Sequence, residues 1–120
     1  MSSVRIEDWI RDVKNQPGSA GIGMILAHQG IVRGTSRSGK PVRGMVLHAD
    51  RGRLEEVLTE AMDWPGVIAV RGWVNEGSLS VGDDIIKVLV AGDIRDNVFA
   101  ALQWLVSLIK SEVLSESELR

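Results

Sequence analysis

The chain has 120 residues, 44% of them hydrophobic and 25% charged, which excludes a disordered chain and suffices for one domain with a buried core. Its formal net charge of −2 excludes a general nucleic-acid binder, because such proteins carry a strong basic excess. Without cysteine it has no disulfide, thiolate metal site or persulfide, and no apolar run approaches the ~20 residues that span a bilayer. We therefore expect a cytoplasmic protein that binds neither nucleic acid nor membrane.

The first half of the chain begins with an amphipathic helix. Apolar residues recur at i, i+3, i+4 and i+7 from Ile6 to Val13, and Pro17-Gly18 ends the pattern. In chain order, the next expected elements are a strand over 21–32, a polar glycine-rich loop over 33–41, a strand over 42–48 and a helix over 54–62.

The second half contains two further strands and a long helix. In chain order, the expected elements are a strand over 67–74, a turn over 75–77, a strand over 85–90, a helix that Asp93 caps and Lys110 ends, and a polar acidic tail over 111–120. This order has no run of βαβ units, so we expect an α+β fold with a mixed, largely antiparallel sheet and three main helices. There is no internal repeat, and residues 1–120 are expected to form a single domain.

The loop between the first two strands is a candidate binding site. Four cations lie within eleven residues of one another, namely Arg33, Arg37, Lys40 and Arg43. Glycines between these cations allow a ligand to approach the backbone closely. Such a loop binds a phosphate through charge and backbone N–H groups, although a solvated hairpin loop has the same composition.

Lys110, at the end of the last helix, is a second candidate. A lysine there usually complements the helix dipole as a solvated cation, but near other cations it can act as a base or nucleophile. His28 and His48 lie in predicted strands, where a satisfied structural histidine is more common than a metal ligand. With no other imidazole in the chain, no metal site is expected.

Three motifs follow one another in a specific order. One strand ends in Gly30-Ile31-Val32-Arg33 before a polar loop, and the segment 77–83 carries the pattern G-x-L-x-x-G-D. The last helix has Arg95 near its start, Phe99 four positions later and Lys110 at its end. Each motif alone is weak. In this order and spacing, over residues 4–112, the chain resembles the large, catalytic subunit of molybdopterin synthase.

The resemblance implies a role in molybdenum cofactor biosynthesis. That family transfers sulfur from the C-terminal thiocarboxylate of a small ubiquitin-like carrier subunit to cyclic pyranopterin monophosphate, which gives molybdopterin. The resemblance implies that Lys110 is catalytic and that Arg33 binds the anionic groups of the substrate. The further cations expected to bind the substrate are Arg37, Lys40, Arg43 and Arg95. The resemblance also implies an α/β hammerhead-like fold, a homodimer within a heterotetramer, and no cofactor.

The chain departs from the family pattern at several positions. Val74 and Asn75 stand where the family has a His-Arg pair, Ile94 replaces a histidine, and Ser117 replaces a second lysine. Losing positioned cations weakens the stabilisation of a charged transition state. Two hypotheses therefore stay open. One is an active, divergent synthase subunit, in which a dimer mate could supply a missing cation. The other is a non-catalytic relative that acts as a carrier-binding or assembly module.

Overall fold

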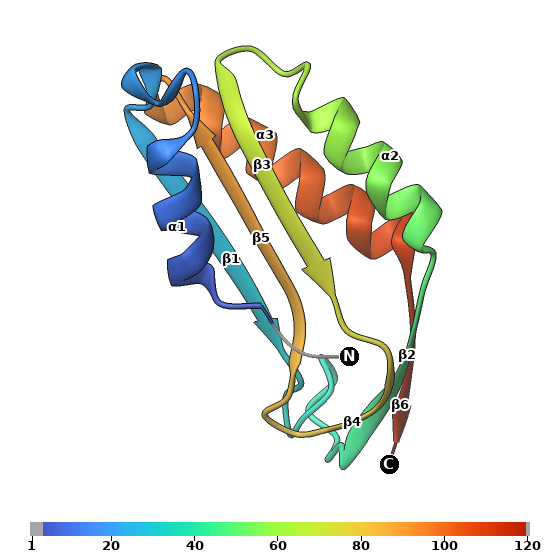
Figure 1. Ribbon diagram of the computed structural model, residues 1–120. Coiled ribbons are helices and arrows are strands. Elements are labelled where there is room, and N and C mark those ends of the chain that lie inside the picture. The colour runs from blue at the N-terminus through green and yellow to red at the C-terminus, as the bar shows by residue number, and fades with distance from the viewer. Residues whose placement is uncertain (1–3, 120) are drawn as a thin grey trace.

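A computed structural model describes residues 4–119, which form two antiparallel three-stranded sheets and three α-helices (Figure 1). The helices are α1 (Ile6–Asn15), α2 (Arg51–Ala61) and α3 (Arg95–Leu108). The strands are β1 (Met24–Ile31), β2 (Gly44–Ala49), β3 (Val67–Val74), β4 (Gly77–Ser80), β5 (Asp84–Gly92) and β6 (Leu114–Leu119). The short segments are a 3-10 helix, Ser19–Gly21, and a π-helix, Ile109–Val113. The α+β class and the three main helices are thus confirmed.

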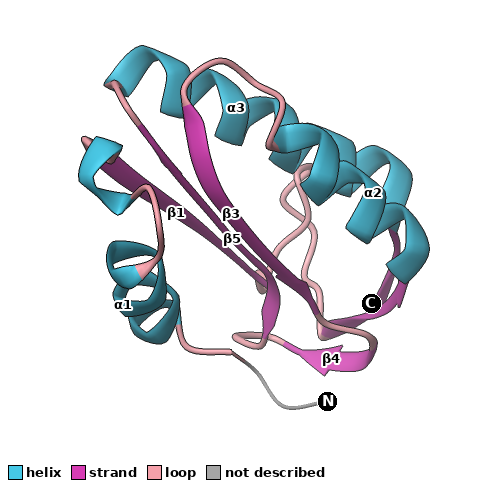
Figure 2. Ribbon diagram, turned by 45° about the horizontal axis from the view of Figure 1, so that its top comes forward, coloured by secondary structure: helices cyan, strands magenta, loops and turns pink. Residues whose placement is uncertain are grey.

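The larger sheet has the strand order β1-β5-β3, with every pairing antiparallel. Helix α1 covers one face of this sheet, while α2 and α3 lie side by side over the other (Figures 1 and 2). The central strand β5 is buried at every residue after Asp84. A strand covered on both faces loses the alternation of apolar and polar residues, which explains why the part of β5 after Asp84 is apolar except for Lys87.

The main hydrophobic core lies between the larger sheet and the helix pair. Val88 and Val90 of β5 pack there with Val57 of α2 and Leu105 of α3, all of them without solvent exposure. A smaller core on the other face includes Val13 of α1. The main core also continues into the second sheet, so the two sheets are held in a fixed relation.

The smaller sheet has the strand order β4-β2-β6 and contains the main differences from expectation. The segment 111–120 was expected to be a polar tail, but Leu114–Leu119 forms β6 and pairs antiparallel with β2 (Figure 1). The turn expected at 75–77 leads into β4, a four-residue strand on the other side of β2. Both are polar edge strands, which a search for apolar alternation does not detect, because their pairing depends on backbone groups.

A close approach of two strands shapes the beginning of β2. A Cβ atom at Gly44 would lie 2.2 Å from the carbonyl oxygen of Leu79 in β4. Glycine is therefore required where β2 and β4 meet, and it allows the short strand β4 to pair closely despite having only four residues.

Candidate functional site

A cleft of about 890 Å³ opens where the end of the larger sheet meets the smaller sheet. Its apolar lining residues come from four strands and are Ile31, Ile85, Met45 and Leu114. Its polar lining comes from the loop after β1, from the end of α3 and from β6. Eight of its twelve lining residues are polar or charged, so the cleft suits a polar, charged ligand that also has an apolar part.

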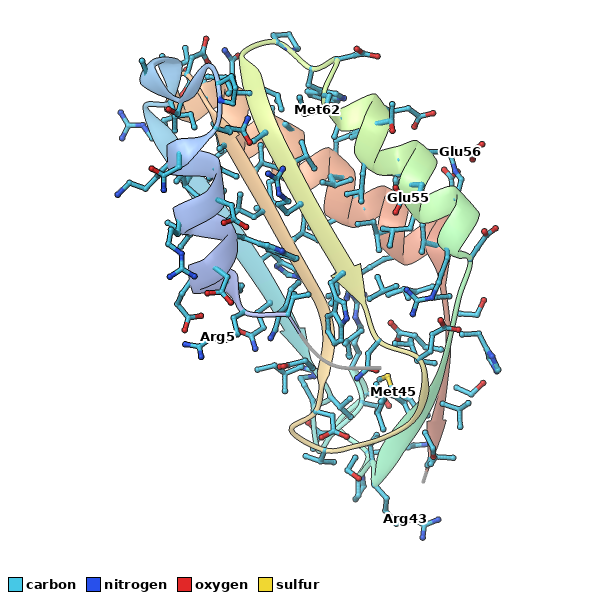
Figure 3. All side chains as sticks on the ribbon, in the orientation of Figure 1. Arg5, Arg43, Met45, Glu55, Glu56 and Met62 are labelled. Atoms are coloured by element: carbon cyan, nitrogen blue, oxygen red, sulfur yellow. The ribbon has the colours of Figure 1, made fainter. Side chains whose placement is uncertain are left out.

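A β-bulge helps to build the apolar part of the cleft. The register between β1 and β5 passes from Gly30↔Ile86 to Ile31↔Asp84, so Ile85 is an extra residue without a partner on β1. Bulges are frequent next to binding sites because they turn a side chain out of the regular alternation. On the smaller sheet, Figure 3 shows Met45 turned toward the body of the molecule.

The cationic loop is a small hairpin closed by its own backbone. The amide of Val42 donates to the carbonyl of Gly34 at 2.9 Å, and the amide of Ser36 donates to the carbonyl of Lys40 at 2.8 Å. Gly39 has a φ of 86°, a conformation that favours glycine and allows the tight turn at the tip. The hairpin holds Arg33 at its base and Arg37 at its tip, and both residues line the cleft.

Lys110 reaches the same cleft from the end of α3. It lies in the π-helical segment, directly after the fully buried Ile109. Short π-helical turns are rare and frequently occur at functional sites, because they change the direction of the residues that follow. Ile109 fixes the end of the helix in the core, so the position of Lys110 at the cleft is set by packing.

Three of the six residues singled out from the sequence meet in this cleft: Arg33, Arg37 and Lys110. Within residues 4–119, its lining does not include Lys40, Arg43 or Arg95. Figure 3 shows Arg43 at the tip of the smaller sheet, pointing away from the molecule. Arg95 opens α3, whose 14 residues span about 21 Å, whereas Lys110 follows the other end of the helix. One chain therefore does not bring Arg95 to Lys110.

Two glutamates, which the sequence did not single out, also line the cleft. Glu116 and Glu118 alternate with Ser117 along β6, and Glu118 stands opposite Met45 in the register with β2. Alternate residues of a strand face the same side, so Ser117 points to the other face of the sheet. The position that the resemblance matched to a lysine thus faces away from the cleft. The alternation in 114–119 is the signal that could have revealed this, had the segment been taken as a strand.

The other departures from the family pattern add no cation to the cleft. Val74 is fully buried in the main core, and the Nδ2 atom of Asn75 donates to the carbonyl of Asp84 at 2.9 Å. Ile94, just before α3, is 57% exposed. Among the described residues, the cleft has three cations and two carboxylates, so it keeps a single net positive charge.

His28 of β1 has an unusual environment near Lys110. Its Nε2 atom is buried and has no hydrogen-bond partner within residues 4–119. Burial lowers the pKa of His28 below its usual value of 6.5, and the positive charge of Lys110 lowers it further. A neutral imidazole is therefore favoured beside the lysine, at the stability cost of an unsatisfied buried nitrogen.

A family model described as MoaE protein matches residues 2–112. The chain belongs to the MoaE family. No curated protein matches the chain in sequence. Among solved structures, it is similar to molybdopterin synthase from Staphylococcus aureus, with a TM-score of 0.80 and 19% identity over 99% of this chain and 87% of that chain.

Two further structures show the same fold. The MoaE protein from Burkholderia ambifaria MC40-6 has a TM-score of 0.77 and 21% identity, covering 99% of this chain and 84% of that one. A complex of subunits 1 and 2 of molybdopterin-converting factor from Helicobacter pylori 26695 contains a chain with a TM-score of 0.69 and 15% identity, covering 97% of this chain and 79% of that one. The hammerhead-like fold implied by the resemblance is confirmed.

Membership of the MoaE family supports a role in molybdenum cofactor biosynthesis. It also confirms the resemblance drawn from the three sequence motifs, which cover nearly the same residues as the family model. In the part of the chain that the structure describes, no helix has the length and apolar character needed to cross a membrane.

The assignment of faces on β6 predicts different effects for two neighbouring lysine substitutions. Glu116→Lys is expected to raise the affinity of this MoaE protein for inorganic pyrophosphate by roughly three- to tenfold, because it replaces a carboxylate with a cation in the cleft. Ser117→Lys, on the other face, is expected to change that affinity by less than about twofold. Isothermal titration calorimetry at low ionic strength measures both. Equal effects of the two substitutions would show that the faces are assigned incorrectly.

The environment of His28 predicts a pH-dependent stability. The unfolded chain protonates His28 near 6.5, whereas the folded chain does so only at lower pH because its pKa is lowered. The stability contributed by neutral His28 is therefore complete above 6.5 and is lost as the pH falls through the lowered folded pKa. Urea unfolding of the wild type and His28→Gln should show their free-energy difference changing across this window. A constant difference would mean that His28 titrates normally in the folded chain.

Proposed function

We propose that the chain is the large subunit of a molybdopterin synthase. It transfers sulfur from the C-terminal thiocarboxylate of a small ubiquitin-like carrier to cyclic pyranopterin monophosphate, giving molybdopterin. The observation that carries the proposal is that Lys110 lines the same cleft as Arg33 and Arg37. Lys110 is far in the sequence from Arg33 and Arg37. The resemblance implied a catalytic role for Lys110 and an anion-binding role for Arg33. Their meeting in one cleft supports both roles.

The cleft has suitable chemistry for an anionic heterocycle. Guanidinium groups form charge-assisted, often bidentate hydrogen bonds with phosphate, which is the role proposed for Arg33 and Arg37. Ile31 and Ile85 offer apolar surface to the ring system beside them. Because the reactive sulfur arrives on the carrier, the reaction needs no cysteine in this chain and no cofactor bound to it.

Lys110 is proposed to act on the carrier's thiocarboxylate. Its ammonium group pairs with the anion and turns the sulfur toward the pterin substrate. As the sulfur bonds to a pterin carbon and displaces an oxygen substituent, the carrier becomes a thioester. Water then attacks the acyl carbon, Lys110 stabilises the negative charge that develops on the acyl oxygen, and the acyl C–S bond breaks, so that the carrier leaves as a carboxylate and the sulfur stays on the pterin. Fixed charges aimed at developing charge usually give the largest single contribution to catalysis. The π-helical segment and the buried Ile109 hold the lysine for this purpose.

The assembly proposed for the chain is a cytoplasmic homodimer with a carrier bound to each protomer. The similar Helicobacter pylori structure is a complex of two different subunits, which supports a small protein partner. Arg95 lies at the opposite end of α3 from Lys110, so its proposed role in substrate binding requires a dimer mate. The homodimer is thus part of the proposed active site.

A second candidate function is a non-catalytic module that binds the carrier or supports assembly. The observation that favours it is the presence of Glu116 and Glu118 in the cleft, where they reduce the attraction for an anionic substrate. In this reading, the fold and the surface that meets the carrier are retained while the chemistry is lost.

Lys110→Ala separates these candidates. If the chain is catalytic, the substitution is expected to lower the rate of sulfur transfer by at least ~10²-fold, the usual scale for removing one group that stabilises developing charge. The thermal midpoint should change little, because a helix-end lysine contributes only about 0.3–1 kcal/mol through the dipole. Lys40→Ala is the matched control, since Lys40 belongs to the same group of cations but does not line the cleft.

The assay uses thiocarboxylated carrier and cyclic pyranopterin monophosphate. Full activity of Lys110→Ala would remove this residue from the mechanism. A wild-type chain that transfers no sulfur beside its authentic carrier would instead support the non-catalytic module.

A further inference from the structure

We propose that Glu116 and Glu118 form a second recognition element of the cleft, which binds an N–H donor edge of a heterocycle whose anionic group is bound by Arg33 and Arg37. This inference rests on the proposed function and deepens it. It states that the donor edge of the pterin ring faces β6, while the phosphate faces the loop hairpin.

The register of the smaller sheet places the two carboxylates in a row. Leu114, Glu116 and Glu118 are alternate residues of β6, and all three line the cleft. Alternate residues of a strand are about 6.6–6.8 Å apart on the same face. Leu114, only 7% exposed, marks the inner end of this row, and the two glutamates extend it toward the open end.

The cations line the same cleft from other segments. Arg33 and Arg37 come from the loop hairpin, and Lys110 comes from the end of α3. Among the ion pairs found within residues 4–119, none joins Glu116 to any of these three cations. The cleft therefore presents both the cationic groups and the Glu116 carboxylate to a ligand, because Glu116 is not neutralised by the cations that share its cleft.

This arrangement selects a particular chemical class of ligand. A carboxylate only accepts hydrogen bonds, so the part of the ligand beside Glu116 must carry N–H donors or a positive charge. A simple phosphate does not meet this condition, because the carboxylates repel it. The apolar residues Ile31, Ile85 and Leu114 favour a flat ring between the two charged regions.

A pterin meets these requirements at its pyrimidine edge. The exocyclic 2-amino group and the ring N3–H are adjacent donors on the same edge, and they match the two oxygens of one carboxylate as a guanidinium does. Glu116 and Glu118 are then specificity-determining residues. They offset the loss of cations by recognising the ring in addition to the phosphate.

The test compares two probes that differ at this edge. Pterin-6-carboxylate has the 2-amino group, whereas lumazine-6-carboxylate has a carbonyl oxygen in its place and keeps the same anionic group. The wild-type chain is expected to bind the pterin at least about tenfold more tightly, because the lumazine oxygen faces a carboxylate. In Glu116→Gln/Glu118→Gln, this ratio should fall to about one to three, without loss of affinity for the lumazine. Arg33→Ala should weaken both probes to the same degree.

Ser117→Gln is the control variant, because it alters the other face of the same strand and should leave the ratio unchanged. Thermal midpoints establish that each variant is folded, and the single substitution Glu116→Gln replaces the double one if that does not fold. Equal wild-type affinities, no measurable binding of either probe, or a preference that survives both substitutions would overturn the inference. If the preference is found but sulfur transfer is not, the proposed reaction fails and the recognition element stands.

Discussion

The backbone pairing between β6 and β2 is the interaction on which the site depends. After α3 ends, the chain passes through one π-helical segment and returns along β2 from Ala49 to Gly44. This pairing turns a polar segment into a wall of the cleft and fixes which of its side chains face inward. It also holds the end of α3, and therefore Lys110, beside the loop hairpin. Hydrogen bonds of this ladder use backbone groups only, so the sequence of the wall is free to vary while its position stays constant.

Much of the larger sheet was predictable from the sequence. Its strands are largely buried, and their apolar composition indicates this burial. The strand expected over 67–74 has the bounds of β3, and that expected over 85–90 lies within β5. Strands β4 and β6 were not predicted, since both are short and mostly polar and depend on β2 for their pairing. Such pairing joins residues distant in the chain, and local periodicity carries no information about it.

The residues of the site were likewise only partly predictable from the sequence. Arg33, Arg37 and Lys110 could be singled out because their residue types and motifs indicate anion binding, and the fold brings them together. Glu116 and Glu118 were missed because the segment 111–120 was expected to be a tail; only as a strand does its alternation place both on one face. Comparison by position alone directs attention to Ser117, whereas the strand turns this residue away from the cleft. His28 was expected to be a satisfied structural residue, but its Nε2 atom lacks a partner within residues 4–119 and lies near the charge of Lys110.

The most direct test of the proposed reaction is a single-turnover experiment with the wild-type chain, thiocarboxylated carrier and cyclic pyranopterin monophosphate. Mass spectrometry of the carrier follows the conversion of its thiocarboxylate to a carboxylate, and the pterin product is analysed for its dithiolene. The proposed function predicts that the thiocarboxylate is consumed only when both the chain and the pterin are present, and that one dithiolene, which holds two sulfur atoms, forms for every two thiocarboxylates consumed. A carrier that stays thiocarboxylated, while the Staphylococcus aureus synthase consumes its own carrier in a parallel reaction, would contradict it.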